Sequence, residues 1–398
     1  MRVLHIITGL GAGGAEQQLR LLLRHLPVRC DVLTLTNPGA VARGIRADGT
    51  RVTHLGMRGN RDLSALPRLV RAVRAGRYDL VHTHLYRACV FGRTAARTAG
   101  VRAVVATEHS LGAAGIEGRP LTAGNRALYL ATERLGSATV AVSATVAARL
   151  RAWGVPGHRI RVVPNGIDAG HFRFDPAARA AARARLGIPD DAFVAGGVGR
   201  LVPGKRYDVL LAAAARVPGV RLLLAGDGPE RTALREQALR LGISARVRLT
   251  GECGGAVASD AGRGAGVPGL LAAMDLFVSP STEETFGLAV LEALAAGLPV
   301  VHVTSPAIDE LPADEAPGAL RIAPGTGPLA DALADAARRY PAATPLRLPA
   351  PAVRRYDIAH SAEQLVAVYD RALATAGAAR RPPAVPHRSV PTLSHPKR

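Results

Sequence analysis

Short apolar runs alternate with amphipathic stretches along most of this chain, and the alternation limits the possible folds more than any other feature. Residues 3–7 and 30–35 have the length and composition of buried strands, and residues 15–26 between them carry apolar side chains at helical spacing. Strand, helix and strand in this order form a βαβ unit, and repeated units build a parallel sheet with helices on its faces. The sequence therefore predicts an α/β protein.

The alternation occurs in two series, which predicts two sheets. The first series has expected strands at residues 3–7, 30–35, 52–55, 78–82, 103–106 and 138–142, and expected helices at 15–26, 63–75, 88–99 and 127–134. The second series begins with a helix at 175–186 and continues with strands at 192–196, 220–224, 247–249, 276–278 and 300–303. The chain of 398 residues is long enough for two α/β domains of ordinary size.

A segment rich in proline and glycine, residues 162–168, interrupts the first series. We place a domain boundary just after it. The expected organisation is a first domain at 1–172, a second domain at 173–357, a terminal helix at 358–376 and a basic tail at 377–398. Gly377 suits the end of that helix. The tail carries five prolines, four arginines and little apolar surface, so we expect it to be disordered.

Composition narrows the class of protein further. Hydrophobic residues make up 48% of the chain but aromatic residues only 4%, so the cores are expected to consist of Ala, Val and Leu, as in helix-covered parallel sheets. The three cysteines, Cys30, Cys89 and Cys253, fit neither a disulfide framework nor a zinc site. No apolar run reaches the length of a membrane span, and residues 1–7 are too short for a signal-peptide core. We therefore expect a cytoplasmic protein.

The formal net charge of +20 raises the question of nucleic-acid binding. The arginines are spread along the chain, and no basic cluster is interleaved with aromatic residues, so we predict no specific nucleic-acid partner. A basic surface also attracts an anionic membrane leaflet. Peripheral contact with the inner face of the cell membrane is therefore a second hypothesis for the charge.

The segment around Glu284 and Glu292 carries the most specific chemical signal. The two glutamates lie eight residues apart, and Phe286, Gly287 and Leu288 follow soon after the first. The segment comes after an expected strand and opens an expected helix, which ends at a Gly-Leu-Pro sequence. The free N–H groups at such a helix start favour a pyrophosphate. Glu292 lies a little over one turn inside the helix, where a carboxylate accepts from ribose hydroxyls.

A second motif, Gly199-Arg200-Leu201-Val202-Pro203-Gly204-Lys205, follows the first expected strand of the second domain. Arg200 offers two donors to a pair of phosphate oxygens, and Lys205 supplies a compact point charge. Lys205 is one of only two lysines in a chain that otherwise uses arginine, and the other lies in the tail. Fixed cations here are suited to a diphosphate that gains negative charge as it departs.

The third motif is a glycine-rich turn with Gly13 and Gly14, which follows the first expected strand and opens a helix. Gly9, Gly11 and Gly14 also meet the spacing of a dinucleotide-binding fingerprint. A dinucleotide site would further need an acidic residue at the end of the second strand, about 20 residues on. That strand ends in Leu33-Thr34-Leu35-Thr36-Asn37, so the glycine pattern alone is weak evidence for NAD.

Taken together, the motifs resemble those of retaining, nucleotide-sugar-dependent glycosyltransferases of the family 4 type, with their E-x7-E motif, over most of residues 1–375. The resemblance implies an α/β protein with the GT-B fold. In that fold two Rossmann-like domains face each other across a cleft, and the C-terminal helix packs back on the first domain. The implied reaction moves a sugar from a UDP- or GDP-linked donor to a hydroxyl of a glycan, lipid-linked or small-molecule acceptor.

The resemblance also implies roles for individual residues. Arg200 and Lys205 hold the diphosphate with N–H groups near Phe286, Gly287 and Leu288, Glu292 binds the ribose, Glu284 contacts sugar hydroxyls, Gly251 lines the base pocket, and Gly13, Gly14 and His109 face the donor and acceptor from the first domain. The expected catalytic set is Glu284, His109, Arg200 and Lys205, and His84 is a further candidate for donor contact. No Asp-x-Asp motif is present, and two basic side chains neutralise a diphosphate, so we expect no metal and no cofactor.

Two departures from the family pattern limit what the resemblance implies. Residues 253–268 form an aperiodic Gly- and Ala-rich insertion near the expected base pocket. The family's Gly-Gly-x-x-Glu stretch is replaced by Thr304-Ser305-Pro306-Ala307-Ile308-Asp309-Glu310, so we assign Glu310 no role. The alternatives are a sugar-nucleotide epimerase or phosphorylase on the same fold, a catalytically silent sugar-nucleotide-binding protein, and a nucleic-acid-binding protein suggested by charge alone.

Overall fold

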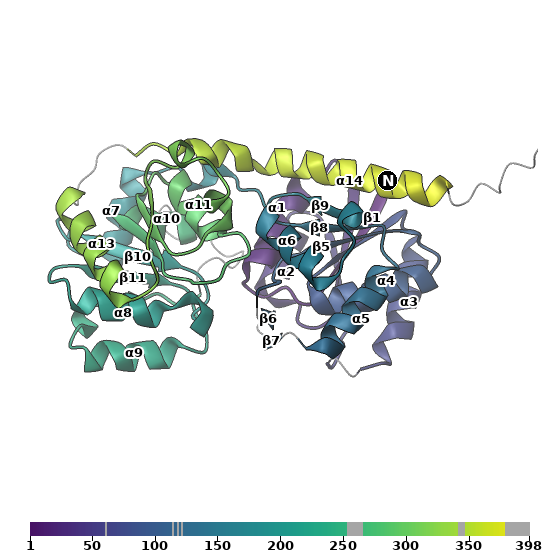
Figure 1. Cartoon of the computed structure of the whole chain (residues 1–398), viewed down its shortest axis with the longest axis horizontal. Helices are drawn as coiled ribbons and strands as arrows, with labels where there is room; N and C mark the ends of the chain where they lie inside the picture. Colours follow the sequence, from purple (N-terminus) through teal and green to yellow (C-terminus); the bar gives the residue numbers. More distant parts are fainter. Residues whose placement is uncertain are drawn as a thin grey trace, which may run out of the picture.

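The computed structural model of the protein describes residues 1–59, 62–113, 115–117, 119–120, 122–252, 266–340 and 347–378. Two α/β halves lie side by side, and one long helix, α14 (Ile358–Ala378), runs along the half that contains the N-terminus (Figure 1). Most of the predicted insertion and nearly all of the predicted tail, residues 379–398, lie outside the described residues.

The first half is built on a seven-stranded parallel sheet in the order β3-β2-β1-β4-β5-β8-β9. Its strands are β1 (Arg2–Ile7), β2 (Arg29–Thr34), β3 (Arg51–His54), β4 (Leu80–His84), β5 (Ala103–Glu108), β8 (Ala138–Ala141) and β9 (Ile160–Val162). The connecting helices are α1 (Gly14–His25), α2 (Gly39–Ala47), α3 (Ala65–Gly76), α4 (Tyr86–Thr98), α5 (Ala123–Glu133) and α6 (Ala144–Trp153), and a small hairpin joins β6 (Gly115–Ile116) to β7 (Arg119–Pro120). The strand order reverses between β1 and β4, which makes their carboxyl ends the natural place for a ligand.

The second half holds a six-stranded parallel sheet in the order β12-β11-β10-β13-β14-β15. Its strands are β10 (Val194–Val198), β11 (Arg221–Ala225), β12 (Val247–Leu249), β13 (Leu276–Ser279), β14 (Val300–His302) and β15 (Ala319–Arg321). Its helices are α7 (Pro176–Leu186), α8 (Tyr207–Ala215), α9 (Arg231–Arg240), α10 (Gly266–Ala273), α11 (Leu288–Ala295), α12 (Pro306–Asp309) and α13 (Thr326–Arg339). Here the order reverses between β10 and β13.

The long helix α14 packs back on the first half, as the fold class predicts. It contacts α1 and β5, and Ala362, Leu365 and Tyr369 join the apolar core around Val105 of β5. Both connections between the halves meet where this helix begins, because Ile167 donates its N–H to the carbonyl of Tyr356 at 2.7 Å. The predicted fold class is thus confirmed. None of the helices in the described ranges combines the length and apolar character that crossing a bilayer requires.

A buried ion cluster fixes α7 to the second sheet. Asp275, directly before β13, lies 2.6 Å from Arg179, 2.7 Å from Arg183 and 3.4 Å from Arg347, and it also accepts the N–H of Val194. Several opposite charges and a backbone donor offset the cost of removing one carboxylate from water. This cluster lies at the amino edge of the sheet, away from the carboxyl ends where a ligand binds.

The structure corrects several sequence-based boundaries. The strand expected at 78–82 is Leu80–His84, because Tyr78 lies before the ladder and its hydroxyl donates to Asp31. The last three residues of the predicted insertion, 266–268, are helical, since a proline is tolerated in the first turn of α10. Helix α14 continues to Ala378, so the predicted tail begins two residues too early. The sequence analysis did not predict helices α2, α6, α8, α9, α12 and α13 or strands β6, β7, β9 and β15.

Candidate active site

The two motifs of the second domain meet at the carboxyl edge of its sheet. Arg200 and Lys205 lie in the loop after β10, and Glu284 lies in the loop after the neighbouring strand β13. Nζ of Lys205 is 2.5 Å from Oε1 of Glu284, and the two side chains are 31% and 14% exposed. The sequence therefore brings a cation and a carboxylate from different loops into one half-buried pair, with exposed Arg200 beside Lys205 in its loop.

Glycines allow these loops to approach one another closely. Gly199 and Gly226 both have a φ of +153°, and a side chain at Gly226 would collide with the backbone of Gly199. The carbonyl of Ala225 accepts the N–H of Gly199 at 2.9 Å, which ties the loop after β10 to the loop after β11. Gly251 forms a bridge to Gly226, so this candidate base-pocket residue lies at the same edge.

Helix α11 starts beside the Lys205–Glu284 pair. Gly287 precedes it with a φ of +104°, and a Cβ there would overlap the side chain of Ser305, so only glycine fits. Phe286 is buried, and the N–H groups of Val290 and Leu291 donate to the carbonyl of Gly287, so Leu288 and Ala289 present the first N–H groups of the helix. Burial raises the pKa of Glu292 to about 7, so this carboxyl holds its proton far more readily than an exposed glutamate does.

The glycine turn of the first domain faces this helix. An ideal Cβ at Gly14 would lie 3.5 Å from Cδ1 of Leu288, which places the turn against the start of α11. Gly13 directly precedes α1, and Glu16 lies in the first turn of that helix. Burial raises the pKa of Glu16 to about 7, and the charge of Arg200 acts in the opposite direction.

Hydrogen bonds across the two domains hold the Glu284 loop in place. Thr285 donates to the carbonyl of His109 at 2.7 Å, and Ser143 donates to the carbonyl of Thr285 at 2.7 Å. Glu310 accepts the N–H groups of Ala144 and Thr145, at 3.0 and 2.8 Å, at the start of α6. Glu310, to which the sequence assigned no role, therefore contacts the first domain at a helix N-terminus, where a carboxylate is favoured.

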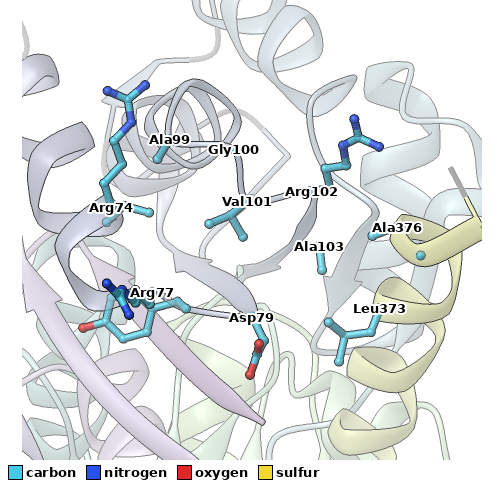
Figure 2. Close-up of a pocket in the computed structure, with 13 residues that line it drawn as sticks. Arg74, Arg77, Asp79, Ala99, Gly100, Val101, Arg102, Ala103, Leu373 and Ala376 are labelled. Atoms are coloured by element: carbon cyan, nitrogen blue, oxygen red, sulfur yellow. The ribbon is translucent and has the colours of Figure 1, made fainter. Parts of the chain in front are cut away.

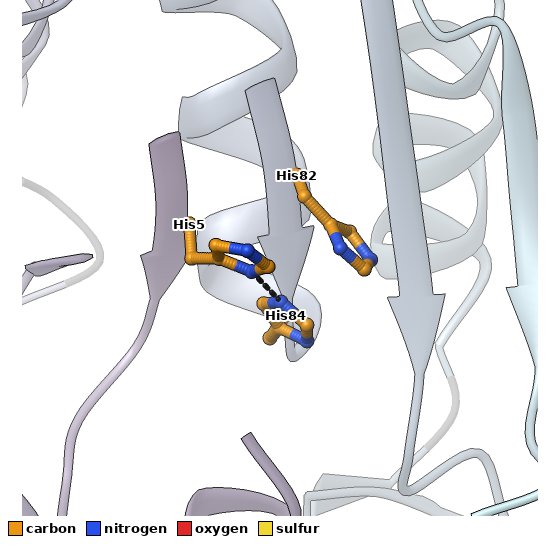
Figure 3. A group of neighbouring side chains, drawn as sticks. All are labelled: His5, His82 and His84. Atoms are coloured by element: carbon orange, nitrogen blue, oxygen red, sulfur yellow. Dashed lines mark hydrogen bonds between the residues drawn. The ribbon is translucent and has the colours of Figure 1, made fainter. Parts of the chain in front are cut away.

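A cluster of buried histidines lies behind His109 at the carboxyl edge of the first sheet. His5 comes from β1, and His82 and His84 come from the same face of β4 (Figure 3). Burial lowers the pKa of His5 to about 3 and that of His109 to about 4. Burial, reinforced by the neighbouring imidazoles, also lowers the pKa of His82 and His84 well below the usual value. All four rings are therefore neutral at neutral pH.

The structure places the sequence-predicted residues in two groups that face each other. The second domain contributes Arg200, Lys205, Gly251, Glu284, Phe286, Gly287, Leu288 and Glu292, and the first contributes Gly13, Gly14 and His109. His84 lies behind His109 and is buried. Sequence reasoning missed the bridging roles of Thr285 and Glu310 and the presence of His5 in the cluster. The signal for His5 was a polar residue in an otherwise apolar strand.

A separate hollow of about 330 Å³ lies at the opposite, amino edge of the first sheet. Arg74, Arg102 and Asp79 line it together with Leu373 of α14 (Figure 2). It contains none of the motif residues. Ligands of open parallel sheets bind at the carboxyl ends of the strands, so we assign the candidate site to the carboxyl edges and not to this hollow.

Two parallel sheets that present their carboxyl edges to each other, with basic and acidic side chains on one edge, define a two-domain α/β protein with a candidate ligand site between the edges. Residues 12–171 match the family described as Glycosyltransferase Family 4, and residues 192–340 match the family described as Glycosyl transferases group 1. The chain belongs to these glycosyltransferases, and its fold is GT-B.

Relatives and solved structures agree with this assignment. The D-inositol 3-phosphate glycosyltransferase of Mycolicibacterium smegmatis is 37% identical over 54% of this chain and 48% of its own length. Its counterpart from Mycobacterium tuberculosis is 35% identical over 65% of this chain and 54% of its own length. The chain thus spans about half the length of the curated relatives it matches.

The HepE protein of Anabaena, solved with UDP and glucose, has a similar structure, with a TM-score of 0.78 and 23% identity over 93% of this chain and 99% of that one. Its complex with UDP-glucose gives a TM-score of 0.75 at 24% identity over 95% of this chain and 100% of that one. At this level of identity the similarity supports the fold.

Proposed function

We propose that the protein is a retaining glycosyltransferase that moves a sugar from a nucleotide diphosphate sugar to a hydroxyl of a glycan, lipid-linked or small-molecule acceptor. The proposal rests on one observation: Lys205, Glu284 and the start of α11 lie together at one sheet edge. Nζ of Lys205 is 2.5 Å from Oε1 of Glu284. This edge lies directly opposite the glycine turn and His109 of the first domain.

The diphosphate of the donor binds on the second domain. Arg200 and Lys205 meet its negative charge, and the N–H groups at the start of α11 add donors along the helix dipole. As the glycosidic bond breaks, the departing diphosphate gains charge, and preorganised cations stabilise that charge without a metal ion. Glu292 accepts from ribose hydroxyls.

The sugar occupies the space between the domains. Glu284 contacts its hydroxyls and stabilises positive charge that develops on the ring, and His109 contacts the sugar from the first domain. The acceptor hydroxyl approaches from the side of Gly13 and Gly14. The loop with Thr285 joins His109 to Glu284 through one hydrogen bond, so the two sugar-contacting groups are set relative to each other.

UDP is the first donor base to test, because HepE was solved with UDP and UDP-glucose. A polyol phosphate is the first acceptor class to test, because the mycobacterial relatives act on an inositol phosphate by name. We further propose that the protein works in the cytoplasm with peripheral contact to anionic lipid, which the net charge of +20 supports. Liposome co-sedimentation that is independent of anionic lipid content would contradict this contact.

The test is a product assay with UDP-, GDP- and ADP-sugars and a panel of polyol-phosphate, glycan and lipid-linked acceptors. We expect release of one nucleoside diphosphate that depends on acceptor, and proton NMR of the product should show the donor's anomeric configuration. An epimerised nucleotide sugar or a sugar phosphate would instead identify an epimerase or a phosphorylase. Glu284→Gln is the control for contaminating activity.

A further inference from the structure

Three histidines of the first domain form a series of hydrogen-bonded rings that ends at the candidate site. Nδ1 of His5 lies 3.0 Å from Nε2 of His84, and Nδ1 of His84 lies 3.1 Å from Nε2 of His109. Adjacent rings are stacked, with centroids 5.3 and 5.4 Å apart. At its far end the series reaches the second domain, because the backbone carbonyl of His109 accepts from Thr285.

Neutral imidazoles restrict how this series is protonated. Each ring has one N–H donor and one acceptor nitrogen, so two bonds in series permit only two arrangements. In the first, His5 donates to His84, His84 donates to His109, and Nδ1 of His109 carries a hydrogen. In the second, every donor is reversed, Nδ1 of His109 is an acceptor, and Nε2 of His5 carries a hydrogen.

The two ends of the series decide between these arrangements. Within the described ranges, neither Nε2 of His5 nor Nδ1 of His109 has a hydrogen-bond partner in the protein. One end therefore carries an unmet N–H group, which is costly when buried. Both atoms are buried, but no part of His5 is exposed, whereas 7% of His109 is exposed beside the Glu284 loop. The first arrangement places the unmet donor at the end nearer the candidate site, where an oxygen of water or of a ligand can accept it.

We propose that His5 and His84 are positioning residues that hold His109 in the tautomer with its hydrogen on Nδ1, so that His109 presents an N–H donor to a hydroxyl oxygen of the donor sugar. The identity of the ligand rests on the proposed function, but the tautomer does not. The first domain thus supplies a neutral donor of fixed direction from rings that are buried.

A metal ion is the competing interpretation of this cluster, because ligand nitrogens of His5, His82 and His84 lie within 4.8 Å of one another. Both nitrogens of His82 are already engaged, however, with the Tyr369 hydroxyl at 2.7 Å and Thr107 Oγ1 at 2.7 Å. Without His82 only two of these ligands remain, and they face each other at hydrogen-bond distance. The geometry therefore favours a hydrogen-bonded series.

The test is nitrogen-15 NMR of the full-length protein with labelled histidine, recorded without ligand and repeated after treatment with a chelator. We expect Nδ1 of His109 to be protonated and its Nε2 unprotonated, with no change on chelation. A hydrogen on Nε2 of His109 would overturn the proposal. Signals of His5 and His84 that move on chelation would overturn it in favour of a metal site.

Variants test whether the series sets the tautomer. His84→Leu should release His109 into a mixture of tautomers, whereas His82→Gln, in the same cluster but outside the series, should leave Nδ1 protonated. An unchanged His109 in His84→Leu would contradict the proposal. With the donor found by the product assay, His84→Leu should lower kcat/KM by about fivefold to tenfold, the value of one hydrogen bond. If no nucleotide sugar is a substrate, the proposed function fails while the tautomer measurement still decides this inference.

Discussion

The carboxyl edges of the two sheets face the same candidate site but present opposite chemistry to it. On the second domain, Lys205 and Glu284 form an ion pair whose side chains are 31% and 14% exposed, with Arg200 exposed beside them. On the first domain, His84 and His109 are buried and neutral, because burial lowers their pKa. Both edges lie at the reversal of strand order, so the difference comes from side chains and not from topology.

This difference indicates a division of work between the domains. A diphosphate carries fixed negative charge and needs cations, which the second domain offers at a partly exposed edge. A sugar is neutral and needs directed hydrogen bonds, which a water-excluding cluster of uncharged rings supplies. Substitutions at either edge test this contrast.

The largest effect is expected for Glu284→Gln, which removes the negative charge from the second edge and keeps the shape of the side chain. We expect kcat to fall by about 100-fold, because preorganised electrostatic groups at a reacting centre have effects of this order. The control is Glu283→Gln, the adjacent and more exposed glutamate, which pairs with Arg149 of the first domain at 3.6 Å. An equal loss of kcat in both variants would show that kcat depends on the structure of the loop and not on the charge of Glu284.

Tyr369→Phe tests the neutral edge of the first domain. The change leaves Nδ1 of His82 without its buried partner, so the free energy of unfolding should fall by about 1–3 kcal/mol. Thr375→Ala is the control on the same helix, because that hydroxyl donates only to a carbonyl of its own helix. Calorimetric unfolding at neutral pH measures the difference. Equal stability of Tyr369→Phe and wild type would show that the histidine cluster does not depend on α14.

Glu292→Gln tests the raised pKa at the start of α11. The folded pKa of about 7 exceeds the usual value, so between these values the folded state binds more protons than the unfolded chain, and the contribution of Glu292 to stability falls as pH rises. Glu292→Gln should therefore be more stable than wild type at pH 8, with a Tm higher by on the order of 2 °C.

The stability gain of Glu292→Gln should vanish below pH 4.5, the usual pKa of the carboxyl. Glu236→Gln on α9, an exposed position, is the matched control. A Glu292→Gln difference that is constant from pH 4 to 8 would mean that this carboxyl is not perturbed in the folded protein.

The smallest effect is expected for Glu310→Ala, which removes an exposed contact between the domains. Loss of a carboxylate at the start of α6 should cost about 0.3–1 kcal/mol, so kcat/KM should fall by about twofold to fivefold with little change in the domains' own stability. Asp314→Ala, a nearby exposed acidic residue, should be neutral. A loss as large as that of Glu284→Gln would assign Glu310 a direct part in binding.

Sequence patterns predicted the site residues at the carboxyl edge of the second sheet better than those at the carboxyl edge of the first sheet. The Lys205 and Glu284 motifs are local, since each lies on one loop after one strand, and alternating apolar runs placed those strands within two residues. His5 and His84 are 79 positions apart, and their contact depends on the register of β1 against β4. The limits of β4 and β10 were each predicted two residues too early, so the two edges differ in the pairing of β1 with β4 and not in the placement of strands.

Tertiary contacts explain why the sequence analysis did not predict several short helices and strands. Helices α2 and α6 and strands β9 and β15 are short, and packing rather than propensity stabilises elements of this length. Glu310 acts through the N-terminus of α6, a helix that the sequence did not predict, so its contact was not accessible to sequence reasoning. The roles assigned to the site residues and the domain boundary near residue 172 stay predictions.

The assignment of the second edge as the donor site is tested most directly by calorimetric titration. UDP, GDP and ADP are titrated into wild type, Lys205→Ala and Arg206→Ala. Arg206 is the adjacent basic residue, and its side chain pairs with Asp208 instead of Glu284. We expect one diphosphate to bind wild type and Arg206→Ala with similar affinity. The same diphosphate should bind Lys205→Ala at least about tenfold more weakly. Binding that is unaffected in Lys205→Ala, or no binding of any diphosphate to folded wild type, would contradict the assignment of the second edge as the donor site.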